Sequence, residues 1–165
     1  MISFLAIAIL SVSSSLATDG LSEVCEFVSP TNQEFCYWTE VHQTWDTTYA
    51  LAQEICELKG SSLAVIRDEA TYQAIMGNLR EKIPDYWNTL YAWIGNTFNP
   101  ETRTVLPSNS YIKWYPINEP RTESESYDNF FLHLYVQRDP ESEMQGMGNV
   151  YPEFLWPAVV CEYKL

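Results

Sequence analysis

The chain has 165 residues, of which 46% are hydrophobic, enough for one domain of ordinary size with a buried core. Its 22 acidic residues outnumber its 9 Lys and Arg, which gives a formal net charge of −13. A basic patch supplies most of the attraction to nucleic acids and anionic membranes, so this charge argues against both kinds of partner.

The first 17 residues have the features of a signal peptide. A short apolar stretch runs from Phe4 to Leu10, and Ser15 and Ala17 offer small residues at the −3 and −1 positions of a cleavage site. The stretch is too short to span a bilayer, and no later segment is apolar enough to do so. We therefore expect a signal peptide over residues 1–17 and a secreted domain over residues 18–165, with no transmembrane segment.

Four cysteines lie in the mature chain. An even number in an exported protein favours disulfides, and three connectivities are open. Cys25 and Cys36 bracket a turn signal at residues 30–32, which is typical of a hairpin closed by its own disulfide. A zinc site is disfavoured, because the chain contains no CxxC pair and His42 and His133 are its only histidines.

Residues 35–41 are rich in aromatics and predict a strand, and residues 49–66 predict a helix, a glycine stop and a second strand. Asp46 or Thr47 is expected to cap the helix, and Gly60 to end it. Residues 62–66 are apolar for the length of a strand. Two adjacent rows form the expected apolar face of the helix: Leu51, Ile55 and Leu58, and Tyr49, Ala52 and Cys56.

Asp68 is expected to cap a second helix, which ends before Pro84. The apolar face of that helix consists of Tyr72, Ile75, Met76 and Leu79. Residues 91–95 predict the next strand. From there to Asn129 the chain is irregular and interrupted by prolines, and a compact domain rarely carries so long an excursion without a use for it.

Residues 130–136 alternate as a strand does. One face would carry Phe130, Leu132, Leu134 and Val136, and the other Phe131, His133 and Tyr135. His133 is best explained as a side chain on that second face. Residues 139–148 are polar and predict a loop, and residues 158–163 predict a closing strand that contains Cys161.

The order of these segments resembles a C-type lectin-like domain in its long form, with an amino-terminal hairpin. The likeness covers nearly all of the mature chain. The segments that carry it are Cys25 and Cys36 followed by Tyr37; Ala52-x-x-x-Cys56 with Gly60 and Leu63-Ala64-Val65-Ile66; Trp93-Ile94-Gly95; and Val160-Cys161-Glu162. The resemblance implies an α+β fold in which two helices pack on small antiparallel sheets, with a long irregular loop region.

The same resemblance implies the disulfides Cys25–Cys36 and Cys56–Cys161. It also exposes a departure, because the family usually has a second core disulfide, whose positions correspond here to Phe130 and, more loosely, Glu153. We therefore expect Phe130 to fill the core and to hold the long loop by packing.

The family's calcium motifs are altered. Its Glu-Pro-Asn reads Glu119-Pro120-Arg121, its Glu-Asn reads Asp128-Asn129, and its Trp-Asn-Asp reads Gly148-Asn149-Val150. Glu119, Asp128 and Asn149 remain candidate metal ligands, and Glu123 and Glu125 could add oxygens. Arg121 places a permanent cation where a neutral donor is usual, so it would repel Ca²⁺ and neutralise nearby carboxylates. No cofactor is therefore expected, and calcium is the only candidate.

The resemblance implies carbohydrate recognition, with Trp114, Glu119, Arg121, Asp128 and Asn149 as candidate ligand-binding residues. Aromatic rings in or beside the loop, Tyr111, Trp114, Tyr115 and Tyr127, offer stacking surfaces for sugars. The alternative is a calcium-independent module that binds an extracellular protein through the same loop surface. No catalytic motif of a hydrolase or metalloprotease is present, and we do not expect an enzyme.

Overall fold

A computed structural model describes residues 25–122 and 130–165; the expected signal peptide lies outside them. The described elements are β1 (Phe27–Val28), β2 (Phe35–Val41), α1 (Tyr49–Glu57), β3 (Ser62–Leu63), α2 (Glu69–Glu81), β4 (Thr89–Asn99), β5 (Thr104–Leu106), β6 (Phe131–Gln137), β7 (Gly146–Val150) and β8 (Ala158–Lys164). None of the helices in this part of the chain is long and apolar enough to cross a membrane.

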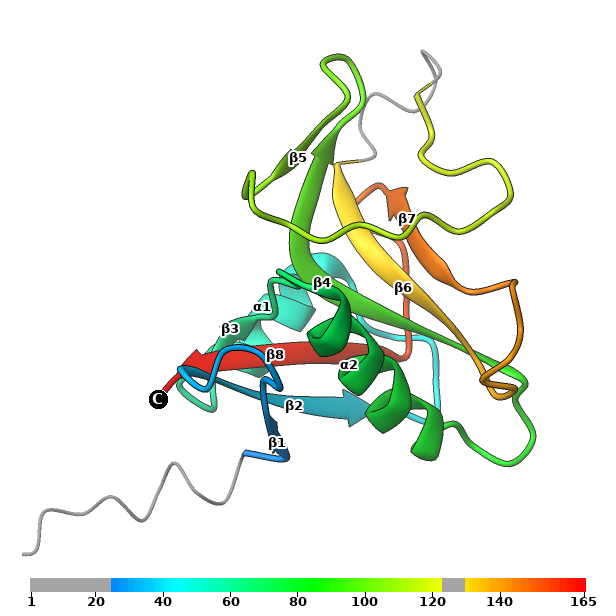
Figure 1. Ribbon diagram of the computed structural model, residues 1–165. Helices are drawn as coiled ribbons and strands as arrows, with labels where there is room; N and C mark the ends of the chain where they lie inside the picture. The colour runs from blue at the N-terminus through cyan, green and yellow to red at the C-terminus, as the bar shows by residue number, and fades with distance from the viewer. Residues whose placement is uncertain (1–24, 123–129) are drawn as a thin grey trace, which may run out of the picture.

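The strands of the described residues form one mixed sheet with the order β1-β2-β8-β4-β6-β7, in which β3 also pairs with β8 and β5 with β4. The last strand, β8, lies between β2 and β4, so the C-terminal strand occupies the middle of the sheet beside the N-terminal β1–β2 hairpin (Figure 1). It runs antiparallel to β2 and parallel to β4, with Ala92 opposite Ala158. The α+β class with two helices is as predicted, but this parallel pairing joins the expected small sheets into one.

Strand alternation gives the sheet two apolar faces, and each face packs against one helix. In Figure 1, α2 lies in front of the central strands and α1 behind them. The core on the α2 side includes Ile75, Met76, Leu79, Leu90, Ala92, Ile94, Leu132, Leu134, Val136, Ala158 and Val160. The core on the α1 side includes Trp38, Tyr49, Ala52, Cys56, Trp93, Val150, Trp156, Val159 and Cys161.

The start of α1 differs from the prediction. Its cap is Thr48, whose side chain accepts a hydrogen bond from the Leu51 amide at 3.3 Å, and not Asp46 or Thr47. The carboxylate of Asp46 instead binds the His42 ring at 2.7 Å. Leu51 and Leu58 are exposed, so only the row of Tyr49, Ala52 and Cys56 is buried. The helix therefore presents a narrower apolar face than the sequence pattern suggests.

The second helix begins and packs as predicted. The Asp68 carboxylate accepts a hydrogen bond from the backbone amide of Thr71 at 2.8 Å, which satisfies one of the free donors at the helix start. The four residues of the predicted apolar face, Tyr72, Ile75, Met76 and Leu79, are all buried.

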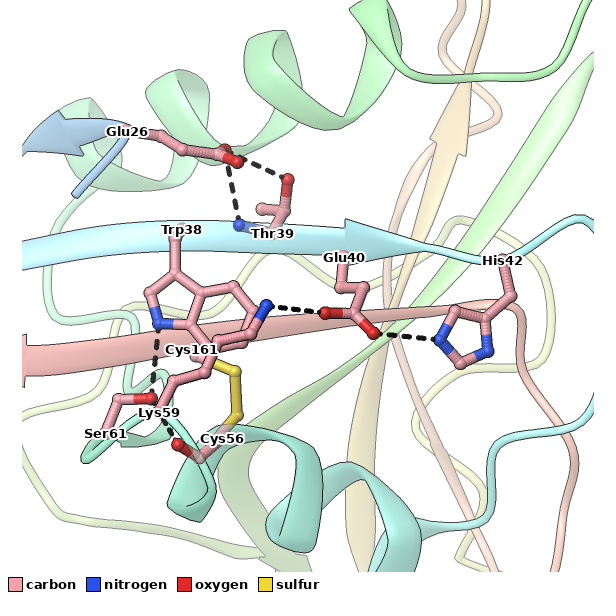
Figure 2. The surroundings of a disulfide bond; sticks show 9 residues. All are labelled: Glu26, Trp38, Thr39, Glu40, His42, Cys56, Lys59, Ser61 and Cys161. Carbon is pink, nitrogen blue, oxygen red and sulfur yellow. Dashed lines mark hydrogen bonds and ion pairs between the residues drawn. A yellow bond between two sulfur atoms is a disulfide. The ribbon is translucent and has the colours of Figure 1, made fainter. Parts of the chain in front are cut away.

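Both expected disulfides are present. Cys25 and Cys36 close the first hairpin with their Cα atoms 5.7 Å apart, and Cys56 and Cys161 tie α1 to β8 at 5.6 Å. Figure 2 shows the second bridge beside Ser61, whose hydroxyl donates to the Cys56 carbonyl at 2.7 Å. The 105-residue separation of the second pair makes this bridge the long-range link of the domain.

A polar chain borders this bridge on the surface (Figure 2). Lys59 lies over the Trp38 ring and pairs with Glu40 at 2.8 Å, and Glu40 also contacts His42 at 3.2 Å. Burial by itself would lower the pKa of His42, but the hydrogen bonds and charges of Asp46 and Glu40 outweigh it and raise that pKa. His42 thus lies partly buried between two carboxylates, and both of them favour its protonated form.

Two expectations about the later strands are wrong. Phe130 is only partly buried, precedes β6 and belongs to neither core; its carbonyl accepts the Phe98 amide at 2.8 Å. The ring that packs is that of Phe131, 4.0 Å from the ring of Tyr49.

The segment expected to be a loop up to Gly148 contains the start of β7, which is fully buried. The sequence pattern did not predict this strand because two of its residues, Gly146 and Gly148, are of a type that is uncommon in strand interiors.

Candidate functional site

The chain between β5 and residue 122 is anchored on β7. The Met147 amide donates to the Lys113 carbonyl at 2.7 Å, and the Tyr115 amide donates to the Met147 carbonyl at 2.8 Å. Gly146 makes this approach possible, because a Cβ there would lie 2.7 Å from the Tyr115 nitrogen. The irregular segment therefore runs beside β7, and this brings the motif at residues 119–121 to the motif at residues 148–150.

Glu119, Arg121 and Asn149 meet in one closed network. The Asn149 amide donates to the Glu119 carboxylate at 3.2 Å, and the Arg121 side chain contacts the same carboxylate at 3.3 Å. The Asn149 side chain accepts from the Arg121 amide at 2.7 Å and donates to the Arg121 carbonyl at 3.0 Å. The three residues thus hold the end of the irregular segment to β7 by side-chain hydrogen bonds.

The Glu119 carboxylate is sealed inside this network. Its side chain is 1% exposed, against 43% for Arg121. Burial raises the pKa of Glu119, while the Asn149 amide, the Arg121 charge and the Tyr135 hydroxyl act against that rise. A buried carboxylate is stable only when it is paired and hydrogen-bonded, so Arg121 acts as its fixed counter-ion.

Trp114, another predicted site residue, lies outside this network. Trp114 packs against Phe98 in a T-shaped contact at 5.2 Å and is partly buried against the core on the α2 side, so its ring is used for packing. Tyr111 packs likewise on Tyr72. Asp128 falls outside the described residues, as do the expected contributors Glu123 and Glu125 and the ring of Tyr127.

The candidate metal ligands Glu119 and Asn149 offer a calcium ion few free oxygens. Ca²⁺ takes six to eight oxygen ligands. Both oxygens of Glu119 and the side-chain oxygen of Asn149 already accept hydrogen bonds, and an arginine occupies the third position of the first motif. Within residues 25–122 and 130–165, no group of three or more His, Cys, Asp or Glu side chains is placed to hold a metal. The described residues therefore do not fit a calcium ion.

Sequence reasoning missed a continuous row of rings on the α1 side of the sheet. Tyr115 stacks on Tyr135 at 4.3 Å, Tyr135 contacts Tyr91 at 5.0 Å, and Tyr91 stacks on Trp156 at 4.5 Å. The row continues through Phe154, 4.4 Å from Trp156. We name these rings, with Tyr151 and Trp45, the aromatic row. Alternation on residues 131–135 predicted part of it, but nothing in the sequence paired those residues with residues 151–156.

A glycine in β7 supports the network. A Cβ at Gly148 would lie 2.7 Å from the Tyr135 ring and 2.9 Å from the Glu119 carboxylate. Gly148→Ala should therefore push both side chains aside and lower the free energy of unfolding by about 2 kcal/mol. Gly77→Ala in α2 is the control, because a Cβ there meets nothing within 4 Å and alanine favours the helix. Denaturant unfolding measures both, and an unchanged Gly148→Ala protein would contradict the close contact.

No protein-family model and no curated protein matches the chain. Solved structures do match. Human lithostathine is 19% identical over 81% of this chain and 86% of its own, with a TM-score of 0.58. The C-type lectin domain of murine dendritic cell inhibitory receptor 2, in complex with an N-glycan, is 17% identical. The match covers 80% of this chain and 92% of that domain, with a TM-score of 0.56. A calcium-independent type II antifreeze protein is 15% identical. The match covers 81% of this chain and 88% of that protein, with a TM-score of 0.54. At these identities the likeness shows the fold.

Proposed function

We propose that this chain, whose fold is that of C-type lectin-like domains, is a secreted binding module that recognises carbohydrate without a standard calcium site. The proposed surface comprises Arg121 and the irregular segment that the network holds against β7. The two disulfides support export, because such bonds persist in oxidising compartments. A binding role agrees with one of the structural neighbours, a C-type lectin domain in complex with an N-glycan.

The closed network of Glu119, Arg121 and Asn149 is the observation that carries this proposal. Its hydrogen bonds and its ion pair hold the two motif segments together, and the guanidinium of Arg121 supplies the positive charge beside the Glu119 carboxylate. The Arg121 side chain is 43% exposed, so its guanidinium can donate to sugar hydroxyls. Two of the similar structures are a domain in complex with an N-glycan and a calcium-independent antifreeze protein, so this fold is compatible with both parts of the proposal.

The second candidate is calcium-independent binding of an extracellular protein. It is favoured by the same network, because the oxygens that would meet sugar hydroxyls in a calcium site are already used within the protein. Ile117, at the surface of the irregular segment, is 51% exposed and would suit a protein interface better than a sugar.

Calcium provides a direct test of the metal-free part. An ion that does not bind the native state cannot stabilise it, so millimolar Ca²⁺ should leave the melting temperature unchanged. Thermal unfolding is measured with Ca²⁺, with Mg²⁺ and with EDTA. A melting temperature that rises with Ca²⁺ but not with Mg²⁺, and that EDTA restores, would contradict the proposal. It would show that residues such as Asp128, Glu123 or Glu125 complete a calcium site.

A glycan array read in calcium and in EDTA separates the two candidates. Carbohydrate recognition predicts specific binding that EDTA does not reduce and that Arg121→Ala weakens by about tenfold, the loss of a charged hydrogen-bond donor. Arg103→Ala removes an exposed arginine from the turn between β4 and β5 and is the control. An array with no binding in either buffer would reject carbohydrate and leave the protein-binding module.

A further inference from the structure

A second candidate site lies where the β2–α1 connection meets the β7–β8 connection. Five residues line a solvent-open pocket of about 390 Å³: Trp45, Tyr151, Glu153, Phe154 and Leu155. This volume is within the usual range of about 300–1,000 Å³ for small-molecule sites. None of the five belongs to the network of Glu119, Arg121 and Asn149.

The pocket is built on fixed backbone. Thr47 and Trp156 exchange backbone hydrogen bonds of 3.1 and 3.0 Å, so the two connections are paired as a short antiparallel bridge. The Tyr49 amide donates to the Pro152 carbonyl at 2.9 Å, which attaches the start of α1 to the same connection. The lining side chains are therefore carried by backbone that is held on both sides.

The rings of the pocket are also held from behind. Trp45 packs on Tyr91 at 5.2 Å and on Trp156 at 5.6 Å, and Phe154 packs on Trp156 at 4.4 Å. Yet Trp45 remains 44% exposed and Tyr151 42% exposed. Large rings that are fixed by packing and still open to solvent can accept a ligand with little loss of side-chain freedom.

Charge selects the kind of ligand. Glu153 is the only charged residue in the lining, and its carboxylate has no ion-pair or hydrogen-bond partner among the described residues. The chain as a whole carries a net charge of −13. Three aromatic rings with one free carboxylate match a cation that has an apolar surface, because the ring faces and the carboxylate both attract positive charge. A sugar would need more hydrogen-bonding side chains than this lining provides.

We propose that this pocket binds a quaternary ammonium group, and that Trp45, Tyr151 and Phe154 contact its methyl groups while Glu153 neutralises its charge. The site is independent of the proposed carbohydrate surface. A soluble compound and a lipid headgroup can both present such a group, and the probes below separate these two sources.

Choline and its neutral analogue 3,3-dimethyl-1-butanol have the same shape and differ in charge, so they test the proposal directly. Titration followed by tryptophan fluorescence should show saturable binding of choline and about tenfold weaker binding of the analogue, in line with cation–π attraction. Glu153→Gln should weaken choline binding about fivefold and leave the analogue unchanged. Glu101→Gln, an exposed acid between β4 and β5, is the control.

Tyr151→Ala should weaken both probes, with the exposed Tyr86→Ala as its control. Equal binding of choline and the analogue, or saturation by neither, would overturn the proposal, as would choline binding that Glu153→Gln leaves intact. Co-sedimentation with phosphatidylcholine vesicles that Glu153→Gln reduces would support the cation site and assign it to a lipid headgroup. Choline binding without co-sedimentation would support it and assign it to a soluble compound.

Discussion

Replacing both Cys56 and Cys161 with alanine will lower the free energy of unfolding by about 4–5 kcal/mol, as the chain-entropy account gives for a loop of this length. The bond joins residues 105 apart and ties α1 to the central strand β8. Without it the unfolded chain gains the freedom of a loop that spans most of the domain, while the native contacts of β8 remain. Denaturant unfolding of the oxidised protein and the double variant measures the difference.

The control is the pair Cys25→Ala and Cys36→Ala, which opens a loop of only 11 residues at the edge of the sheet. Its expected cost is smaller, about 3 kcal/mol. If the short bridge proves the more costly of the two, loop entropy is not the main source of stability, and strain or residual structure in the unfolded chain must be considered instead.

Much of the fold could be predicted from the sequence, because its elements are strongly patterned. The α2 face and its Asp68 cap, the strand at residues 35–41 and the closing strand appear in the structure at or within one residue of the expected bounds. The cap of α1 differs from the prediction because Asp46, Thr47 and Thr48 are all suitable residues. Asp46 instead binds the ring of His42, four residues before it, and the backbone of Thr47 pairs with Trp156, a long-range contact that no local pattern reveals.

The site was harder to predict, since its residues meet through long-range contacts. The motif positions Glu119, Arg121 and Asn149 were named, and the structure places them together. The use of Trp114 in the core depends on its contact with Phe98, which no local pattern reveals. The pocket around Trp45 depends on backbone pairing between residues 47 and 156, and sequence spacing carries no signal for it.

His133 should make the protein sensitive to acid. Its ring is fully buried among aromatic rings, and neither ring nitrogen has a hydrogen-bond partner within the described residues. Burial, with the nearby Arg121 charge, lowers the pKa of His133 to about 3 from its ordinary 6.5. Between these values the unfolded chain binds one more proton than the native protein, so stability falls as the pH falls below 6.5.

We expect His133→Phe to remove this loss. Between pH 7.5 and pH 4.5 the contribution of His133 should lower the free energy of unfolding of the wild-type protein by roughly 3 kcal/mol, at about 1.4 kcal/mol per pH unit below 6.5. The variant should not show this decrease. Carboxylates titrate alike in both proteins, so the difference between their pH profiles isolates the histidine. His133→Leu repeats the measurement with a smaller side chain.

His42 supplies a control of opposite sign. Because the pKa of His42 is raised in the native protein, protonated His42 stabilises the fold at low pH, and this contribution is lost as the pH rises through that pKa. His42→Gln should therefore make the free energy of unfolding fall more steeply as the pH is lowered. Unfolding by urea at pH 7.5, 6.0 and 4.5 compares the three proteins. If His133→Phe and wild type have parallel pH profiles, the pKa of His133 in the native protein is close to its ordinary 6.5, which would contradict the effect of burial argued here.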